Sequence, residues 1–129
     1  MFRFLLICAG GFVGTGARYG LNGLVSRWIG ETFPYGTMTI NIVGSFAIGV
    51  LFIATGTDSP ILVSATTRQF LMTGILGGFT TFSSFSLQSL SLLRDGEIAS
   101  AIANIVLSVA LGLLAAWAGE SLAQRIWLG

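Results

Sequence analysis

The chain has neither histidine nor lysine, and only 9% of its 129 residues are charged, whereas a soluble domain carries roughly 25%. Six arginines and five carboxylates leave a net charge of +1, so no basic surface is present to bind nucleic-acid phosphates. Without histidine, and with Cys8 as the single cysteine, the usual zinc sites and an intramolecular disulfide are excluded. The lack of histidine, reactive cysteine and paired carboxylates also argues against an enzyme.

Long uncharged stretches are what the sequence has instead, with 53% hydrophobic residues and a mean hydropathy of +0.88. Three charge-free intervals, at 32–57, 69–93 and 98–119, are 26, 25 and 22 residues long. About 20 helical residues cross the hydrocarbon layer. The shorter interval at 4–17 reaches that length if Arg18 lies inside the span and snorkels to the headgroups or faces water.

We therefore predict an all-α membrane protein with one transmembrane domain, residues 1–129, and four membrane-spanning helices. The predicted spans are 4–25, 36–56, 69–93 and 98–121. The alternative for the first span is a cleaved signal peptide, because Arg3 precedes an apolar run. That run continues past Arg18 and three further spans follow, which favours a retained helix.

The arginines give little information on orientation in the membrane. Four spans divide the arginines outside them three to two between the two sides: Arg3, Arg68 and Arg125 against Arg27 and Arg94. Counting Arg18 on the second side removes even this difference, so the positive-inside rule does not assign an orientation. Two interpretations stay open: weak orientation information in a small protein, or a homodimer of two oppositely inserted, antiparallel copies.

Small residues one helical turn apart recur in the first three spans. The pairs are Gly10 and Gly14, Gly16 and Gly20, Ser45 and Gly49, and Gly74 and Gly78. Such pairs allow close approach of two helices and favour oligomerisation. With 18 glycines in the chain, such pairs also arise by chance, so none of them alone identifies an interface.

Polar residues inside the spans are costly unless hydrogen-bonded, and so mark candidate functional positions. The second span contains Asn41, with Ser45 one turn later. The fourth span has polar or small residues at every fourth position: Ser100, Asn104, Ser108 and Gly112. This stripe is compatible with a contact between helices, with hydroxyls that bond to carbonyls of their own helix, or with the wall of a water-filled pathway.

The centre of the third span is a poor helical sequence, Gly77-Gly78-Phe79-Thr80-Thr81. Adjacent glycines end helices, and threonines begin them. We predict a helix that stops near Leu76 and restarts near Thr80, with a simple kink as the alternative. A break at mid-membrane leaves backbone groups without partners, and broken helices at this depth mark ion sites in transporters.

The side chains near the break favour an anion, because no carboxylate is present there and hydrogen-bond donors dominate. The candidate donors are Asn41, Thr81, Ser83, Ser84, Asn104 and Ser108. Phe82 and Phe85, at i and i+3, offer the positive edges of their rings, unless they are ordinary apolar packing. The pattern suits a small, strongly hydrated anion.

Residues 10–19, 36–46 and 77–85 resemble the bacterial fluoride channels called Fluc, and the third stretch, GGFTTFSSF, is the most specific. The resemblance implies a fluoride-selective channel in the bacterial plasma membrane. Such a channel lets fluoride leak passively out of the cytoplasm and so lowers its toxicity. It also implies a dual-topology, antiparallel homodimer with two pores, whose other partner is the lipid bilayer.

Position by position, the resemblance implies a role for each matching residue. Asn41, Phe82 and Phe85 correspond to pore-lining residues, and Arg18 to an arginine near an aqueous vestibule; the hydroxyl-bearing positions are Thr81, Ser83 and Ser84. The backbone carbonyls of Gly77 and Thr80, from both subunits, correspond to those that hold a structural, non-transported Na⁺. The chain departs from the family where Ser84 replaces a threonine and where Gly112 replaces a fourth-helix hydroxyl.

Two other functions fit the hydropathy. A four-helix, dual-topology exporter of small molecules or cations has a similar size, but proton-coupled cation export normally needs a titratable acid in the membrane, and the charge-free intervals of the four spans contain none. A non-transport membrane subunit explains the glycines but gives no reason for a helix break flanked by threonines.

Overall fold

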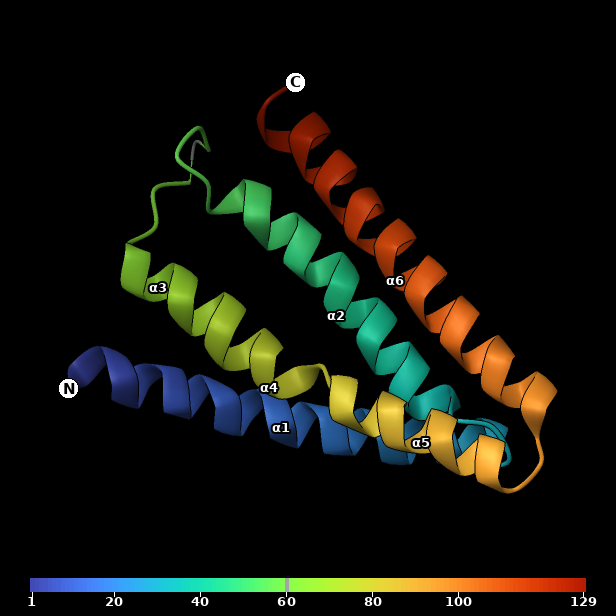
Figure 1. The fold of residues 1–129 in the computed structure, drawn as a ribbon. Helices are drawn as coiled ribbons and strands as arrows, with labels where there is room; N and C mark the ends of the chain where they lie inside the picture. Colours follow the sequence, from blue (N-terminus) through green and yellow to red (C-terminus); the bar gives the residue numbers. More distant parts are fainter. Residues whose placement is uncertain (60) are drawn as a thin grey trace.

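The computed structural model describes residues 1–59 and 61–129, and all regular structure in that part of the chain is helical (Figure 1). In chain order the elements are α1 (Phe2–Ile29), α2 (Tyr35–Ala54), α3 (Ala65–Gln69), the π-helix η1 (Phe70–Leu76), α4 (Gly77–Phe79), α5 (Phe82–Arg94) and α6 (Ile98–Trp127). Four helical runs are long and apolar enough to cross a membrane, the third being Ala65–Arg94. The predicted all-α, four-span architecture is confirmed.

The helices at the two ends of the chain extend beyond the spans predicted from hydropathy. α1 continues to Ile29 rather than residue 25, and α6 continues to Trp127 rather than residue 121. Hydropathy marks where charge enters the sequence, but a helix keeps its backbone hydrogen bonds in the headgroup region, where charged side chains are solvated. α1 ends at Gly30, whose φ of 92° lies in the left-handed region that glycine adopts without strain.

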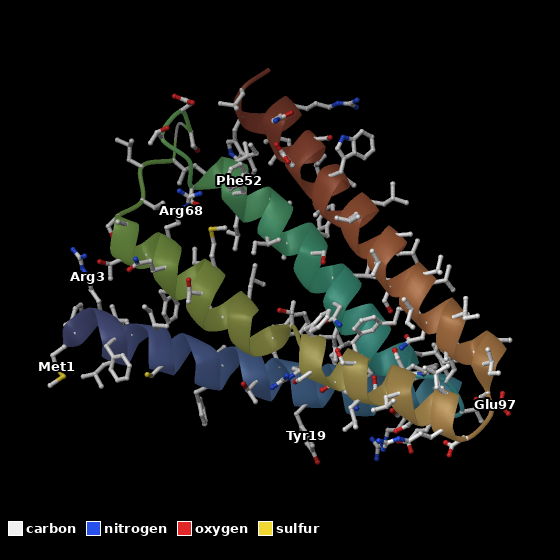
Figure 2. The ribbon with its side chains drawn as sticks, viewed as in Figure 1. Met1, Arg3, Tyr19, Phe52, Arg68 and Glu97 are labelled. Atoms are coloured by element: carbon white, nitrogen blue, oxygen red, sulfur yellow. The ribbon has the colours of Figure 1, made fainter. Side chains whose placement is uncertain are left out.

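Two pairs of membrane spans build the bundle: the first with the third, and the second with the fourth. α1 packs along η1 and α4, and α2 packs along α6, while α5 contacts α6 (Figure 1). Figure 2 shows Arg3 and Arg68 toward one end of the molecule and Glu97 at the other. The Arg68 guanidinium lies 5.5 Å from the centre of the Phe52 ring, which ties the start of the third span to the end of α2.

Glycines bring α1 against the third span. A Cβ atom added to Gly10 would lie 2.9 Å from the Phe70 carbonyl oxygen and 3.0 Å from the Gly74 Cα. One added to Gly78 would lie 2.6 Å from the carbonyl oxygen of Gly11. Three of the four predicted small-residue pairs therefore pack within a single chain, since Gly49 of α2 contacts the backbone of α6 in the same way. Among the described residues, none has an atom within 4 Å of a Cβ added to Gly16.

The outside of the bundle is apolar. Phe12, Trp28 and Trp117 are mostly exposed, whereas the buried core is small and includes Ile40 and Ala101. A soluble protein rarely exposes so continuous an apolar surface. Lipid is the solvent that this surface fits.

Candidate functional site

The third span is broken at Thr80 and Thr81. Thr80 has φ −81° and ψ 158°, and Thr81 has φ −151° and ψ 110°, so both are extended between α4 and α5. The predicted break is confirmed, but the predicted stop near Leu76 is wrong, since Gly77 is still helical at φ −64° and ψ −35°. Gly78 also stays in the helix, where its missing side chain allows contact with Gly11.

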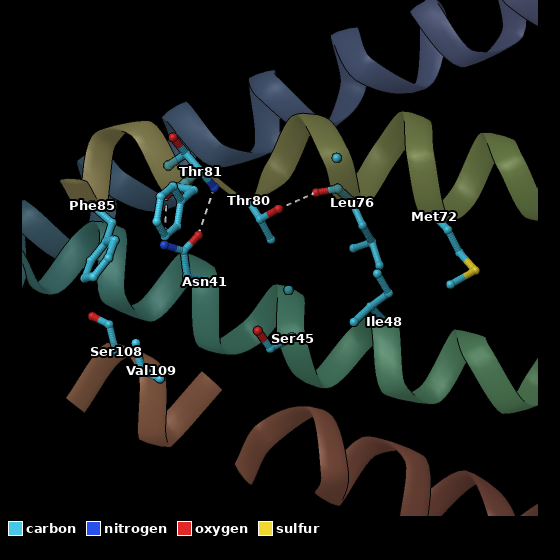
Figure 3. A pocket seen from close by; sticks show the side chains of 13 residues that line it. Asn41, Ser45, Ile48, Met72, Leu76, Thr80, Thr81, Phe85, Ser108 and Val109 are labelled. Carbon is cyan, nitrogen blue, oxygen red and sulfur yellow. Dashed lines mark hydrogen bonds between the residues drawn. The ribbon is translucent and has the colours of Figure 1, made fainter. Parts of the chain in front are cut away.

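The two threonines complete the helix ends on either side of the break. The N–H and the hydroxyl of Thr80 both donate to the Leu76 carbonyl at 3.0 Å, which finishes α4 (Figure 3). The Thr81 hydroxyl oxygen accepts the Ser84 N–H at 3.2 Å and so caps the N-terminus of α5. A short extended segment thus costs few backbone hydrogen bonds.

Asn41 of α2 joins the broken segment through both atoms of its amide group. Its Oδ1 accepts the Thr81 N–H at 2.8 Å, and its Nδ2 donates to the Thr81 carbonyl at 3.1 Å (Figure 3). One N–H of the amide remains for another acceptor. Asn41 therefore supports the break as well as facing the cavity beside it.

A cavity of about 350 Å³ lies beside the break, between α2, the third span and α6 (Figure 3). Its polar side chains are those of Asn41, Ser45, Thr80, Thr81 and Ser108. The rings of Phe82 and Phe85 also line it, with centroids 5.5 Å apart and planes tilted by 50°. None of the described residues that line it has a charged side chain, so its side chains offer hydrogen-bond donors and ring edges.

A second cavity, of about 240 Å³, lies on the α1 side of the same break. Arg18 lines it together with Ser84, so the structure brings the predicted arginine close to the break. Thr81 lines both cavities and is 92% buried between them. Thr81 thus lies between a cavity lined by the charged side chain of Arg18 and one lined only by uncharged side chains.

Two predicted pore residues line neither of these cavities. Ser83 is exposed at the start of α5, with its hydroxyl 3.4 Å from that of Thr81. Asn104 is only 1% exposed and is hydrogen-bonded to Ser89 and Ser108. Asn104 therefore lies between α5 and α6 rather than on the cavity wall.

Three polar residues of the second cavity were not selected from the sequence: Thr15, Asn22 and Thr37. Asn22 lies one helical turn after Arg18, and Thr37 one turn before Asn41, so each shares a helix face with a predicted site residue. That spacing was the signal that could have identified them.

The carbonyls of Gly77 and Thr80 suit a hard cation. Among residues 1–59 and 61–129, the loop and cap hydrogen bonds include none to either carbonyl oxygen. Gly77 is exposed, and both residues line the cavity. Backbone oxygens without donors are ligands of the type that Na⁺ accepts in broken membrane helices.

These features define a four-span membrane protein with an uncharged polar cavity at a broken helix. The chain belongs to the family described as CrcB-like protein, Camphor Resistance (CrcB), whose model matches residues 5–120. It is 52% identical over 120 residues to the fluoride-specific ion channel FluC of Opitutus terrae, covering 93% of this chain and 91% of the relative. It is 47% identical over 117 residues to FluC of Rhodospirillum rubrum, covering 91% of each chain.

A further relative, FluC of Methylocella silvestris, is 46% identical over 123 residues, covering 95% of this chain and 94% of that one. The family and the four candidate spans identify a multi-pass bacterial membrane protein. The relatives are named as ion channels rather than enzymes, in agreement with the expectation from composition.

Proposed function

We propose that this protein is a fluoride-specific ion channel that lets fluoride flow passively out of the cell. The observation that carries the proposal is the cavity at the broken helix, whose described lining offers donors and ring edges but no charge. A full positive charge would hold any anion tightly and release it slowly, whereas several weak contacts permit both entry and exit. The FluC names of the relatives supply the identity of the anion.

In this proposal the anion exchanges its water for protein contacts along the break. Arg18 attracts it into the second cavity, and Thr81 and Ser84 are the hydroxyls next to that cavity. Asn41, with its remaining N–H, and Ser108 then supply donors in the first cavity, between the edges of Phe82 and Phe85. Ser83 is exposed at the start of α5, with its hydroxyl 3.4 Å from that of Thr81, and is a further candidate donor.

We propose an antiparallel homodimer as the working form. Phe82 is 79% exposed although it lines the cavity, so a single chain leaves this wall open on one side. A second copy in the opposite orientation would cover it, and the near-balanced arginines permit insertion both ways. The same pairing would bring four carbonyls together, two from Gly77 and two from Thr80, around one structural Na⁺. That ion would supply a fixed positive charge that joins the copies and favours an approaching anion.

Anion efflux from liposomes tests the proposed function. Purified protein is reconstituted with internal potassium fluoride or potassium chloride, and a potassium ionophore sets the voltage. We expect rapid fluoride efflux and none of chloride above protein-free liposomes. Equal efflux of both anions, or of neither, would contradict the proposal.

A further inference from the structure

A chain of hydrogen bonds links the two walls of the cavity through two residues that do not line it, Asn104 and Ser89. Ser108, on the cavity wall of α6, donates its hydroxyl hydrogen to Asn104 Oδ1 at 3.3 Å. Asn104 Nδ2 donates to Ser89 Oγ at 2.9 Å, and the Ser89 hydroxyl donates to the Phe85 carbonyl at 2.8 Å. Phe85 lies on the opposite wall, on α5.

The direction of each hydrogen bond in this chain follows from its neighbour, starting at the Phe85 carbonyl and ending at Ser108. Since the Ser89 hydrogen is used by the Phe85 carbonyl, Ser89 faces Asn104 only as an acceptor. The amide of Asn104 must then turn its NH₂ group to Ser89 and its oxygen to Ser108. A serine hydroxyl has one hydrogen, so Ser108, while it donates to Asn104, presents only lone pairs to the cavity.

We infer that Asn104 is a positioning residue that sets how strongly Ser108 donates to an anion in the cavity, with Ser89 fixing the orientation of its amide. This inference rests on the proposed function. An anion reaches the Ser108 hydrogen only by displacing Asn104 Oδ1, so the contact stays weak and the anion leaves quickly. Burial supports this role, since Asn104 is 1% and Ser89 6% exposed and water does not compete for their bonds.

The bond between Asn104 and Ser89 also holds α5 to α6. Within residues 1–59 and 61–129 it is the only side-chain hydrogen bond between these two helices. An apolar replacement of Asn104 or Ser89 therefore removes the hydrogen bond between α5 and α6. It also removes the contact that fixes the amide orientation. The consequences for Ser108 and for stability can be measured separately.

The test for Ser108 is the concentration dependence of fluoride flux in Asn104→Leu and Ser89→Ala. Asn104→Leu removes the acceptor of the Ser108 hydrogen, and Ser89→Ala removes the partner that keeps the Asn104 oxygen turned to Ser108. In each variant we expect the half-saturating fluoride concentration and the maximal rate to fall together, by about three- to tenfold. In a Ser108→Ala background neither substitution should lower the half-saturating concentration further. A role in packing alone would lower the rate without this tighter binding, and that result would overturn the inference.

Ser86→Ala is the matched control. The Ser86 hydroxyl donates to the Phe82 carbonyl at 2.9 Å, one turn back, as Ser89 does to Phe85, but it is exposed and has no bond to α6. We expect wild-type flux and half-saturation from this variant. An equal effect in Ser86→Ala and Ser89→Ala would place the cause within α5 and overturn the role of Asn104.

A thermal double-mutant cycle tests the chain of bonds without fluoride. Asn104→Leu and Ser89→Ala are measured singly and together, and we expect the double variant to lose less stability than the sum of the two single losses. Additive losses would overturn the inference. Absence of fluoride efflux from the wild type would instead contradict the proposed function, and the cycle would still decide whether Asn104 and Ser89 act as a pair.

Discussion

Asn41 and Thr81, 40 positions apart in the sequence, are joined at two points: the Asn41 side chain accepts the Thr81 N–H and donates to the Thr81 carbonyl. This side chain occupies both backbone groups of an extended residue in the middle of a membrane span. Leaving such groups unpaired in hydrocarbon costs several kcal/mol each. The break in the third span therefore depends on a residue of the second.

Asn41→Asp should lower fluoride flux by at least about tenfold, because a carboxylate cannot donate to the Thr81 carbonyl and adds a charge that repels the anion. The measurement is fluoride efflux from liposomes at matched protein content. Gln124→Glu, the same change of group at an exposed position on α6, is the control and should conduct normally. Wild-type efflux from Asn41→Asp would remove Asn41 from the conduction path.

Replacing the cavity phenylalanines tests the contribution of their ring edges. Phe82→Ile and Phe85→Ile keep apolar volume but remove the aromatic quadrupole, so we expect each to lower fluoride flux by about tenfold or more. Phe12→Ile is the control, since Phe12 is 83% exposed on α1 and Phe82 is 79% exposed beside the cavity. If all three variants conduct alike, the two phenylalanines are packing residues.

The number and type of the spans could be predicted from the sequence because charge-free length is a property of each segment alone. The break and its restart near Thr80 could also be predicted, since Thr81 caps α5, but the residue at which the first half of the helix stops could not. Gly77 and Gly78 look like a helix end, yet they stay helical, and Gly78 uses its missing side chain to contact Gly11. The π-helical turns of η1 before them have no local signature. Contacts between segments decided both features.

Some residues of the candidate site could likewise be predicted from the sequence, and others could not. Thr81 and Phe85 could be selected because they lie next to the break in sequence and carry the right chemistry. The position of Asn104 could not be predicted, because a polar stripe on a helix faces a cavity or a neighbouring helix with equal ease. The hydrogen-bond partner that draws Asn104 toward α5 is Ser89, which lies 15 residues away in the sequence.

Dual topology predicts that both chain ends are found on both sides of the membrane. Tags at the two termini should each be labelled from either side in roughly equal amounts, because the arginine balance is close to even. Strictly one-sided labelling of active protein would falsify this prediction. Adding three lysines at the N-terminus should bias insertion and lower activity, and co-expression of an oppositely biased copy should restore it.

The carbonyls of Gly77 and Thr80 predict that Na⁺ is needed for assembly but is not transported. Exchange of Na⁺ for a large organic cation should lower fluoride flux and the dimer fraction together, since four partial negative charges would then face one another. Return of Na⁺ should restore both, with no Na⁺ flux through the protein. Unchanged flux and assembly after complete removal of Na⁺ and similar cations would remove this site.

Glycine substitutions separate close packing within the chain from an open helix face. In Gly10→Ala the new methyl group would lie 2.9–3.1 Å from backbone atoms of Phe70, Gly74 and Ile75, which cannot move as a flexible side chain does. Such overpacking costs about 1–3 kcal/mol, so the melting temperature in detergent should fall by several degrees. Gly23→Ala, on the same helix but with no atom of the described residues within 4 Å of the new methyl group, is the control. Because α1 supports the segment that precedes the break, Gly10→Ala should also lower fluoride flux. Equal melting temperatures for the two variants would mean that α1 and the third span are less closely packed than their facing glycines indicate.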